Sequence, residues 1–214
     1  MTADTDEFDD LIDGLAGDGY AVAAGFLPPR MVEDLIRVVE TRAEAGRLAG
    51  AAVGRDRARS LDRHVRKVEA SWLDGSSPAE VEFLAWAERL RIALNRRLFL
   101  GLFEFEAQLL VYPPGGFYQR HLDSLAGTRN RIVSLVAYLN RDWQAEHGGE
   151  LDVWRAPDDA GEPAMTVEPR AGTLVLMLSE EIPHAVRPAN AVRRVIAGWF
   201  RVNASGSQRI DPAR

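Results

Sequence analysis

The sequence predicts one mainly β domain with flanking helices, and three observations support this prediction. First, the 214 residues suit a single large domain, and no internal repeat or long Gly/Ser linker divides them. Second, apolar residues recur at helical spacing in the first half of the chain. Third, from about residue 102 apolar residues alternate with polar ones in short runs that turn clusters separate. Helices followed by many short strands are typical of a β-sandwich or barrel with helices packed against it.

Three segments in the first half of the chain are expected to form helices. The first covers about residues 8–16 and ends at Gly17. The second follows a Pro-Pro pair and covers about 29–48, because proline is tolerated in the first turn of a helix. The third follows Ser-Pro-Ala-Glu at 77–80, which matches a capping box, and Gly101 is its expected stop. Its apolar face consists of Leu84, Ala87, Leu90, Leu94 and Leu98.

The core strands are expected in the second half of the chain. The first covers about 103–111, where every second residue is apolar, as in a half-buried strand. Pro- and Gly-containing clusters at 113–116 and 156–163 are expected to be turns. Further strands are expected at 131–139, 151–154, 173–178 and 193–202, with peripheral strands at 20–22 and 68–72. The last dozen residues are expected to form a loose tail.

Composition excludes several classes of function. The chain has no cysteine, which excludes thiolate nucleophiles, thiolate-bound zinc and iron–sulfur clusters and fits a reducing compartment. Its acidic start, MTADTDEFDD, differs from the basic start of a signal peptide, and no stretch approaches the roughly 20 apolar residues of a membrane span. We therefore expect a cytoplasmic protein without a membrane partner. The net charge of -6 argues weakly against a nucleic-acid partner.

Basic residues are concentrated at 55–67, a segment that contains five Arg and one Lys but only two Asp. A solvated loop is the favoured interpretation, and a loop that contacts the substrate is the alternative. His64 lies in this run and is interpreted as an exposed or hydrogen-bonded histidine rather than a metal ligand.

A candidate metal site emerges from two of the four histidines. His121 and Asp123 are two residues apart, and on a strand such residues point to the same face. His184 follows an apolar strand-like run and precedes an expected turn, RPANA at 187–191. It would complete a set of two histidines and one carboxylate. Such a facial triad leaves coordination positions open and suits non-haem Fe(II) that activates oxygen. The alternative is a surface histidine beside an unrelated carboxylate.

Arg193 lies nine residues after His184, at the head of a largely apolar segment. Its guanidinium could hold the far carboxylate of a co-substrate in a bidentate manner. A surface salt bridge is the alternative, although an apolar segment is an unfavourable place for an unpaired charge. Arg194 points to the opposite face of the same strand, and periodicity alone does not decide between the two arginines.

Four stretches carry a resemblance to a known family: YPPGGFYQRHLDS, YLNRDW, HGGELDVW and PHAVRPANAVRRVIAGWF. Together they resemble the prolyl-hydroxylase class of Fe(II)/2-oxoglutarate oxygenases, especially the oxygen-sensing prolyl hydroxylases and their bacterial relatives. The resemblance runs from about Leu109 to Phe200 and implies a double-stranded β-helix (a jelly-roll or cupin-like core). On this basis residues 1–214 form one oxygenase domain. In it, residues 1–101 are a helix-rich support, 102–202 the jelly-roll core with the iron site, and 203–214 a tail.

The resemblance implies roles for individual residues. His121, Asp123 and His184 would be the catalytic iron ligands, and Arg193 would pair with the C5 carboxylate of 2-oxoglutarate. The remaining implied roles concern three tyrosines and one histidine. Tyr112 and Tyr138 would line the co-substrate pocket, with ordinary core packing as the alternative; Tyr118 would face the substrate or pack in the core; His147 would have no metal role.

The chain also departs from the family pattern. Ala185 stands where relatives often have Glu directly after the last iron-binding histidine, and Ala197 stands where a hydroxyl residue often follows the arginine. The segment between Tyr112 and His121 is one residue shorter than in the oxygen-sensing enzymes. These changes leave the implied iron ligands intact but put some co-substrate and substrate contacts in question.

The implied activity is hydroxylation of a C–H bond with Fe(II), 2-oxoglutarate and O2, yielding succinate and CO2; ascorbate is a further candidate cofactor. A prolyl residue in a protein or peptide is the first candidate substrate. Asp123 as a ligand favours hydroxylation over halogenation, because halogenating relatives leave that position free for chloride. The alternatives are a nucleic-acid dealkylase, a hydroxylase of free amino acids or small metabolites, a cupin-like metalloenzyme without 2-oxoglutarate, and a catalytically silent binding module. The sequence leaves the substrate, the stereochemistry and the oligomeric state open.

Overall fold

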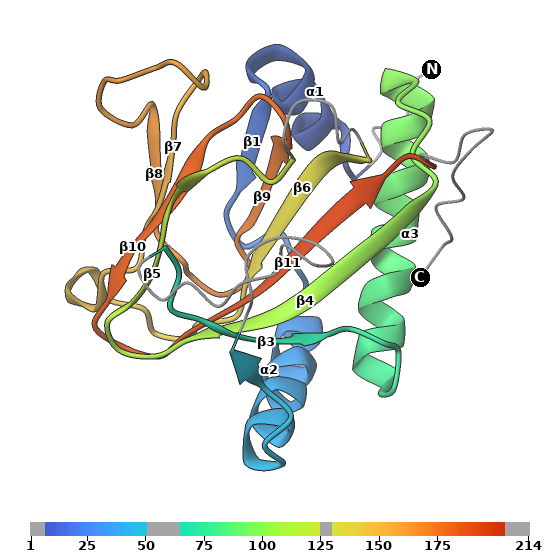
Figure 1. The fold of residues 1–214 in the computed structure, drawn as a ribbon. Coiled ribbons are helices and arrows are strands. Elements are labelled where there is room, and N and C mark those ends of the chain that lie inside the picture. The colour runs from blue at the N-terminus through green and yellow to red at the C-terminus, as the bar shows by residue number, and fades with distance from the viewer. Residues whose placement is uncertain (1–6, 51–64, 125–129, 204–214) are drawn as a thin grey trace, which may run out of the picture.

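The computed structural model describes residues 7–50, 65–124 and 130–203. In this part of the chain three helices pack against two antiparallel sheets (Figure 1). The helices are α1 (Asp9–Asp18), α2 (Pro29–Glu44) and α3 (Pro78–Leu98), with a 3-10 turn, η2 (Ala145–His147). The strands are β1 (Tyr20–Ala23), β2 (Ala49–Gly50), β3 (Glu69–Trp72), β4 (Glu104–Tyr112), β5 (Gly116–His121), β6 (Arg131–Tyr138), β7 (Leu151–Val153), β8 (Met165–Val167), β9 (Leu174–Leu178), β10 (His184–Ala189) and β11 (Arg193–Arg201).

The two sheets face each other and form the expected double-stranded β-helix. The large sheet has the order β1-β9-β6-β11-β4-β3-β2, and the small sheet has the order β5-β10-β7-β8. Between them lies an apolar layer to which both sheets contribute, including Leu110, Val136 and Val195 from the large sheet and Val153 and Val186 from the small one. Strands β1, β2 and β3 show that the first half of the chain supplies sheet strands as well as helices.

The helices cover the other face of the large sheet, where Figure 1 shows them behind it. Alternate residues of the central strands, such as Leu109, Leu135 and Ile196, point to this side and pack against α1, α2 and α3. Phe83 and Trp86 of α3 stack on each other within this layer. The helices therefore support one face of the large sheet, and the opposite face can carry a functional site.

Helix ends differ from the predictions because local backbone conformation decides them. Helix α1 continues past Gly17 to Asp18, and Gly19 caps it in the left-handed conformation with φ 78°. Helix α2 ends at Glu44 rather than near residue 48. Helix α3 ends at Leu98, where Phe99 caps it in the left-handed conformation (φ 54°), so Gly101 is not the stop.

The start of α3 is as predicted, but only half of the capping box forms. The Ser77 hydroxyl accepts a hydrogen bond from the Glu80 backbone N–H at 3.3 Å. The Glu80 carboxylate does not return to the Ser77 backbone; it accepts hydrogen bonds from Arg42 and from the backbone N–H groups of Asp74 and Gly75. Glu80 is completely buried and links α3 to α2 and to the loop after β3.

The predicted strands are confirmed within one or two residues, but the sequence prediction missed β2, β5, β8 and β10. Strand β10 extends through the segment after His184 that was expected to be a turn. Residues 65–67, at the end of the basic run, lie along β5, where Arg66 forms a bridge with Tyr118. The rest of the run with His64, and the tail from residue 204, lie outside the described residues. In the described ranges no helix combines the length and hydrophobicity of a membrane span.

Candidate metal centre and the buried arginine beside it

The two histidines of the predicted triad lie opposite each other on neighbouring strands. His121 is the last residue of β5, His184 is the first residue of β10, and the two are directly paired in the small sheet. Asp123 is not on the strand with His121, as the spacing argument had assumed, but in the bend that follows it. This bend still brings Asp123 to the histidines, and one ligand atom from each of the three side chains lies within 4.8 Å of the others.

Both imidazole rings are oriented by the backbone in the same way. Nδ1 of His121 lies 2.8 Å from the carbonyl oxygen of Gln119, and Nδ1 of His184 lies 3.2 Å from that of Ile182, in each case two residues earlier. A carbonyl can only accept, so each Nδ1 is the donor in this contact, and Nε2 is the ring atom left to bind a metal. Both Nε2 atoms face Asp123, at 3.6 Å from its two carboxylate oxygens.

The protonation states of His184 and Asp123 are those that a divalent cation requires. Burial and the neighbouring His121 lower the pKa of His184 to about 4, so its ring is neutral near pH 7. Burial would raise the pKa of the Asp123 carboxyl, but His184 and His121 outweigh it and hold that pKa well below its usual range. Two imidazoles and one carboxylate on one side of a centre fit a non-haem Fe(II) site with open positions.

Arg193 lies at the start of β11 and is only 1% exposed. Its Nε donates to the carbonyl of Gly149 at 2.8 Å, and its guanidinium lies 4.8 Å from the ring centre of Tyr112 and 5.1 Å from that of Tyr138. Because this side chain is buried, the surface salt-bridge alternative is wrong, and among the described residues no carboxylate pairs with the guanidinium. A buried cation without an anion is costly, which indicates that an anionic ligand belongs here.

Tyr112 and Tyr138 lie on β4 and β6, the two neighbours of β11, and both are fully buried. Burial raises the pKa of Tyr112 and raises that of Tyr138 to about 12, so both phenols are neutral donors near pH 7. The Tyr138 hydroxyl has no hydrogen-bond partner. The buried Tyr138 hydroxyl and the neighbouring Arg193 guanidinium could both donate hydrogen bonds to a carboxylate ligand.

The sequence prediction missed the contribution of Gly149, although the double glycine in HGGE was a signal for it. Gly149 has φ 70°, a conformation that favours glycine, and a Cβ there would lie 3.1 Å from Cδ of Arg193. Its carbonyl is also the acceptor for Arg193. The turn before β7 therefore needs glycine in order to position the arginine.

Two other side chains can now be placed. The Tyr118 ring stacks on His121 with centroids 3.6 Å apart, and the Arg66 guanidinium lies 4.8 Å from the Tyr118 ring centre. Tyr118 is thus beside the candidate metal centre rather than in a distant part of the core. His147 lies in η2, where its Nδ1 accepts from the Gln144 backbone N–H, and it is not part of the cluster.

Comparisons with known proteins agree with this geometry. Residues 107–201 match the family model of the 2OG-Fe(II) oxygenase superfamily. A solved structure of a Pseudomonas putida prolyl-4-hydroxylase is 40% identical and superposes with a TM-score of 0.81, covering 89% of this chain and 97% of that one.

More distant relatives come from animals. Human Egl nine homolog 1 is 30% identical over 146 residues, which make up 64% of this chain but only 33% of that protein. The chain thus spans about a third of the length of this relative. A Trichoplax adhaerens prolyl hydroxylase in complex with a hypoxia inducible factor peptide fragment has the same fold, with a TM-score of 0.77 at 22% identity.

Proposed function

This chain belongs to the 2OG-Fe(II) oxygenase superfamily and is an Fe(II)- and 2-oxoglutarate-dependent oxygenase, and from this premise we propose that it hydroxylates a prolyl residue in a protein or peptide. The observation that carries the proposal is the juxtaposition of His121, Asp123 and His184 with the buried, unpaired Arg193. The first three would hold Fe(II), and Arg193 would pair with the far carboxylate of 2-oxoglutarate. The prolyl substrate is supported by the similarity to the Pseudomonas putida enzyme over nearly its whole length.

Each residue in this proposal has a task that its surroundings support. The two histidines present Nε2 to the metal position because each Nδ1 donates to a backbone carbonyl. Asp123 stays ionised, so it would contribute negative charge to the cation, and its occupation of a coordination position favours hydroxylation over halogenation. Arg193 would bind the co-substrate carboxylate through a charge-assisted pair, and the Tyr138 hydroxyl would donate to the same group.

When bound, Fe(II), 2-oxoglutarate and O2 supply oxidative decarboxylation to succinate and CO2 together with an oxidant able to hydroxylate a C–H bond. The protein's part is to orient these groups and to keep water away from them. The apolar layer between the sheets, with Leu110, Val136 and Val195, provides such a dry wall beside Arg193.

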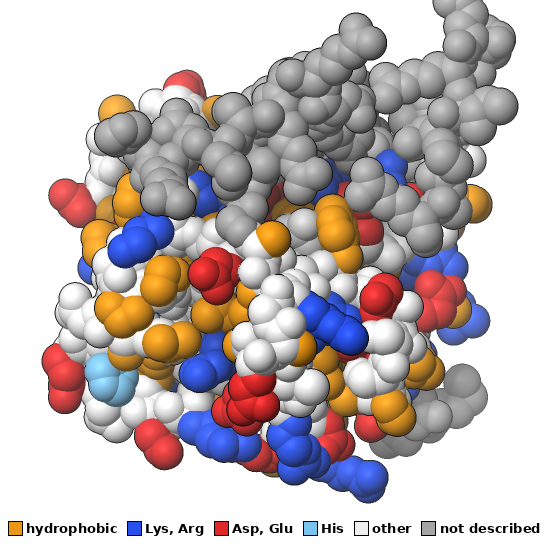
Figure 2. Space-filling view, turned by 60° about the horizontal axis from the view of Figure 1, so that its bottom comes forward, with side chains coloured by type: hydrophobic (Ala, Val, Ile, Leu, Met, Phe, Trp, Pro, Cys, Tyr) orange, Lys and Arg blue, Asp and Glu red, His pale blue; other side chains and the backbone are white. Residues whose placement is uncertain are grey.

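The alternative of nucleic-acid dealkylation has little support from surface charge. On the face shown in Figure 2, acidic and basic side chains are intermixed rather than gathered by sign. A surface that follows a phosphate backbone needs a continuous positive stripe instead. The described residues on this face show no such stripe.

The test is product analysis with the Fe(II)- and 2-oxoglutarate-supplied enzyme. We expect proline-containing peptides or cell lysate proteins to gain 16 Da on prolyl residues, with one succinate formed per hydroxylation. The same prolyl modification should disappear from cells in which the gene is deleted. Hydroxylation confined to free amino acids or to nucleobases, with stoichiometric succinate, would refute the peptide substrate but not the oxygenase class. His184→Ala is the inactive control.

A further inference from the structure

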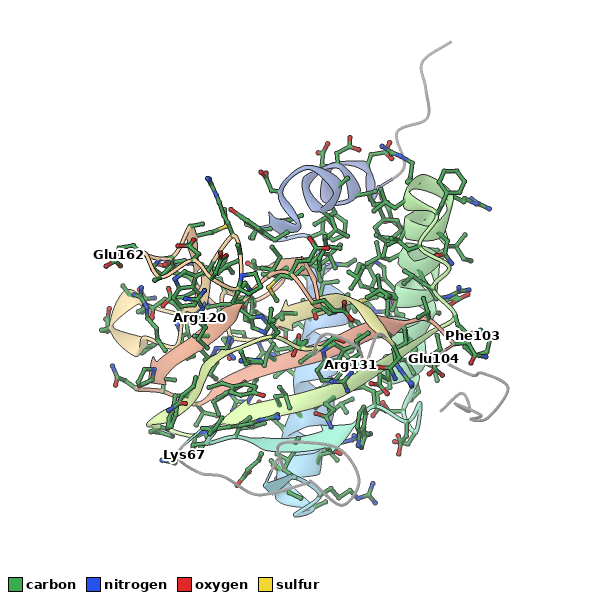
Figure 3. All side chains as sticks on the ribbon, turned by 45° about the horizontal axis from the view of Figure 1, so that its top comes forward. Lys67, Phe103, Glu104, Arg120, Arg131 and Glu162 are labelled. Carbon is green, nitrogen blue, oxygen red and sulfur yellow. The ribbon has the colours of Figure 1, made fainter. Side chains whose placement is uncertain are left out.

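A cluster of four charged residues lies on the site-facing side of the large sheet and has no role in the chemistry above. Glu104 and Glu106 come from β4, Arg131 from the start of β6 and Arg201 from the end of β11. Figure 3 shows Arg131 and Glu104 close together at one end of the sheet, away from Lys67 at the other end. Glu106 and Arg201 are 6% and 2% exposed, so the cluster is partly built into the core.

The cluster lies next to the candidate metal centre. Alternate residues of β11 share a face, so Trp199 is on the same side as Arg193, six residues or roughly 20 Å further along the strand. Ser134 and Glu106 are the direct neighbours of Trp199 on β6 and β4. The Ser134 hydroxyl lies 2.8 Å from that of Ser179, and the Ser179 carbonyl accepts a hydrogen bond from the backbone N–H of Ser124, the residue after Asp123. Trp199 therefore lies beyond the metal ligands as seen from Arg193, where a substrate rather than the co-substrate would approach.

Arg131 covers this tryptophan, and Glu106 fixes it there. The Arg131 guanidinium lies 3.8 Å from the centre of the Trp199 ring. Its Nε and Nη2 both donate to Oε1 of Glu106, at 3.0 and 2.7 Å. The other oxygen of Glu106 is 3.4 Å from Arg201, which in turn pairs with Glu104. Along these pairs acidic and basic side chains alternate.

We propose that Glu106 is a specificity-determining residue: by pairing with Arg131 it removes the positive charge from the substrate side of Trp199. A lone half-buried arginine at this place would attract acidic peptide segments, because a partly desolvated charge discriminates strongly by sign. Paired with Glu106, Arg131 offers a flat, uncharged surface beside the reacting prolyl residue. This inference rests on the proposed peptide substrate.

The test measures peptide binding rather than turnover. The probes are three fluorescein-labelled peptide pools with a central proline and one flanking Asp, Gln or Lys. Their binding to the Mn(II)- and 2-oxoglutarate-loaded protein is followed by fluorescence anisotropy. The compared quantity is the ratio of the Kd values for the Asp and Lys pools, relative to the wild type. Glu106→Gln should shift this ratio about tenfold toward the Asp pool. Arg131→Gln should shift it toward the Lys pool by a similar factor.

Two controls separate charge selectivity from mere structural support. Glu104→Gln, which removes the outer pair with Arg201 but leaves the pair between Glu106 and Arg131 in place, should leave the ratio within about threefold of the wild type. The double variant with Glu106→Gln and Arg131→Gln should return to the wild-type ratio. Equal weakening of all pools by Glu106→Gln would overturn the inference and leave Glu106 a structural residue; if that variant fails to fold, an unchanged ratio in Arg131→Gln overturns it. A wild type that binds none of the pools would refute the peptide substrate, and this inference with it.

Discussion

Arg193 and Arg194 are neighbours in the chain, yet their side chains reach opposite faces of the large sheet. Arg193 is buried between Tyr112 and Tyr138 on the site side. Arg194 lines a hollow of about 300 Å³ on the helix side, together with residues of α2. The sequence could not decide between them, because both faces of β11 are apolar. The structure separates them by burial, and the role of Arg193 toward 2-oxoglutarate stays a prediction.

We expect Arg193→Ala to weaken 2-oxoglutarate binding by a factor of about one hundred or more. The reason is that loss of a buried charge-assisted pair costs several kcal/mol. Arg194→Ala, the matched control, should change the affinity only a few-fold, as is usual for a charge outside the pocket. Calorimetric titration of 2-oxoglutarate into the Mn(II)-loaded variants measures both. The reverse ranking would place the carboxylate anchor on Arg194.

Gly149 offers a second prediction for single residues. We expect Gly149→Ala to lower the free energy of unfolding by about 1–3 kcal/mol, because alanine is strained at φ 70° and its Cβ would press on Arg193. The 2-oxoglutarate affinity should fall as well, since the carbonyl that holds Arg193 must move. Gly17→Ala is the matched control: Gly17 lies in α1, and a Cβ there would meet no other atom within 4 Å, so alanine should be neutral or slightly stabilising. Identical behaviour of both variants in denaturant and ligand titrations would contradict this role of Gly149.

At the scale of elements, one buried ion pair joins α2, β3 and α3. Arg42 and Glu80 are almost fully buried and 2.7 Å apart, and Arg42 also donates to the Ser71 hydroxyl at 2.8 Å. We expect Glu80→Ala to lower the free energy of unfolding by about 3 kcal/mol, because it leaves Arg42 buried with the exposed Asp74 as its one counter-charge among the described residues. Glu82→Ala on the exposed face of α3 should stay within about 0.5 kcal/mol of the wild type. Urea unfolding compares them; equal stabilities would show that the pair is dispensable.

The sequence predicted elements where periodicity was strong and failed where tertiary structure decides. The strands at β4, β6, β9 and β11 were found because their apolar residues alternate or run continuously. Strand β10 was missed because Pro188 and Asn190 indicate a turn, whereas the structure accommodates the proline through irregular pairing between β10 and β5. Strands β5 and β8 carry polar residues and are too short to show a period. Similarly, the sequence implied that Asp123 would share a strand with His121, but its real position depends on a bend that no spacing rule reveals.

At the scale of the whole molecule, the candidate site depends on both sheets at once. Of the candidate metal ligands, the two histidines lie on β5 and β10 of the small sheet, and Asp123 lies in the bend after β5. Arg193 and the two tyrosines come from β11, β4 and β6 of the large sheet. A metal ion together with 2-oxoglutarate would thus connect the sheets through a bound group, and neither sheet could unfold without releasing it. Ligand binding should therefore stabilise the domain as a unit rather than one loop.

We expect Mn(II) and 2-oxoglutarate together, each at about one hundred times its Kd, to stabilise the protein by at least about 2.7 kcal/mol, the value for one such ligand. For a domain of this size that corresponds to a rise in Tm of about 5–10 °C. Because the co-substrate would be held by the metal at one end and by Arg193 at the other, 2-oxoglutarate without metal should produce much less than this rise. In Asp123→Ala, the further rise on adding 2-oxoglutarate to the Mn(II)-treated protein should be lost. Scanning calorimetry with each ligand alone and with both makes the comparison. Two results would contradict this prediction: the full rise in Tm with 2-oxoglutarate alone, or a further rise in Tm on adding 2-oxoglutarate that remains in Asp123→Ala. Either result would mean that the two ligands bind independently and that the sheets are not connected through the metal.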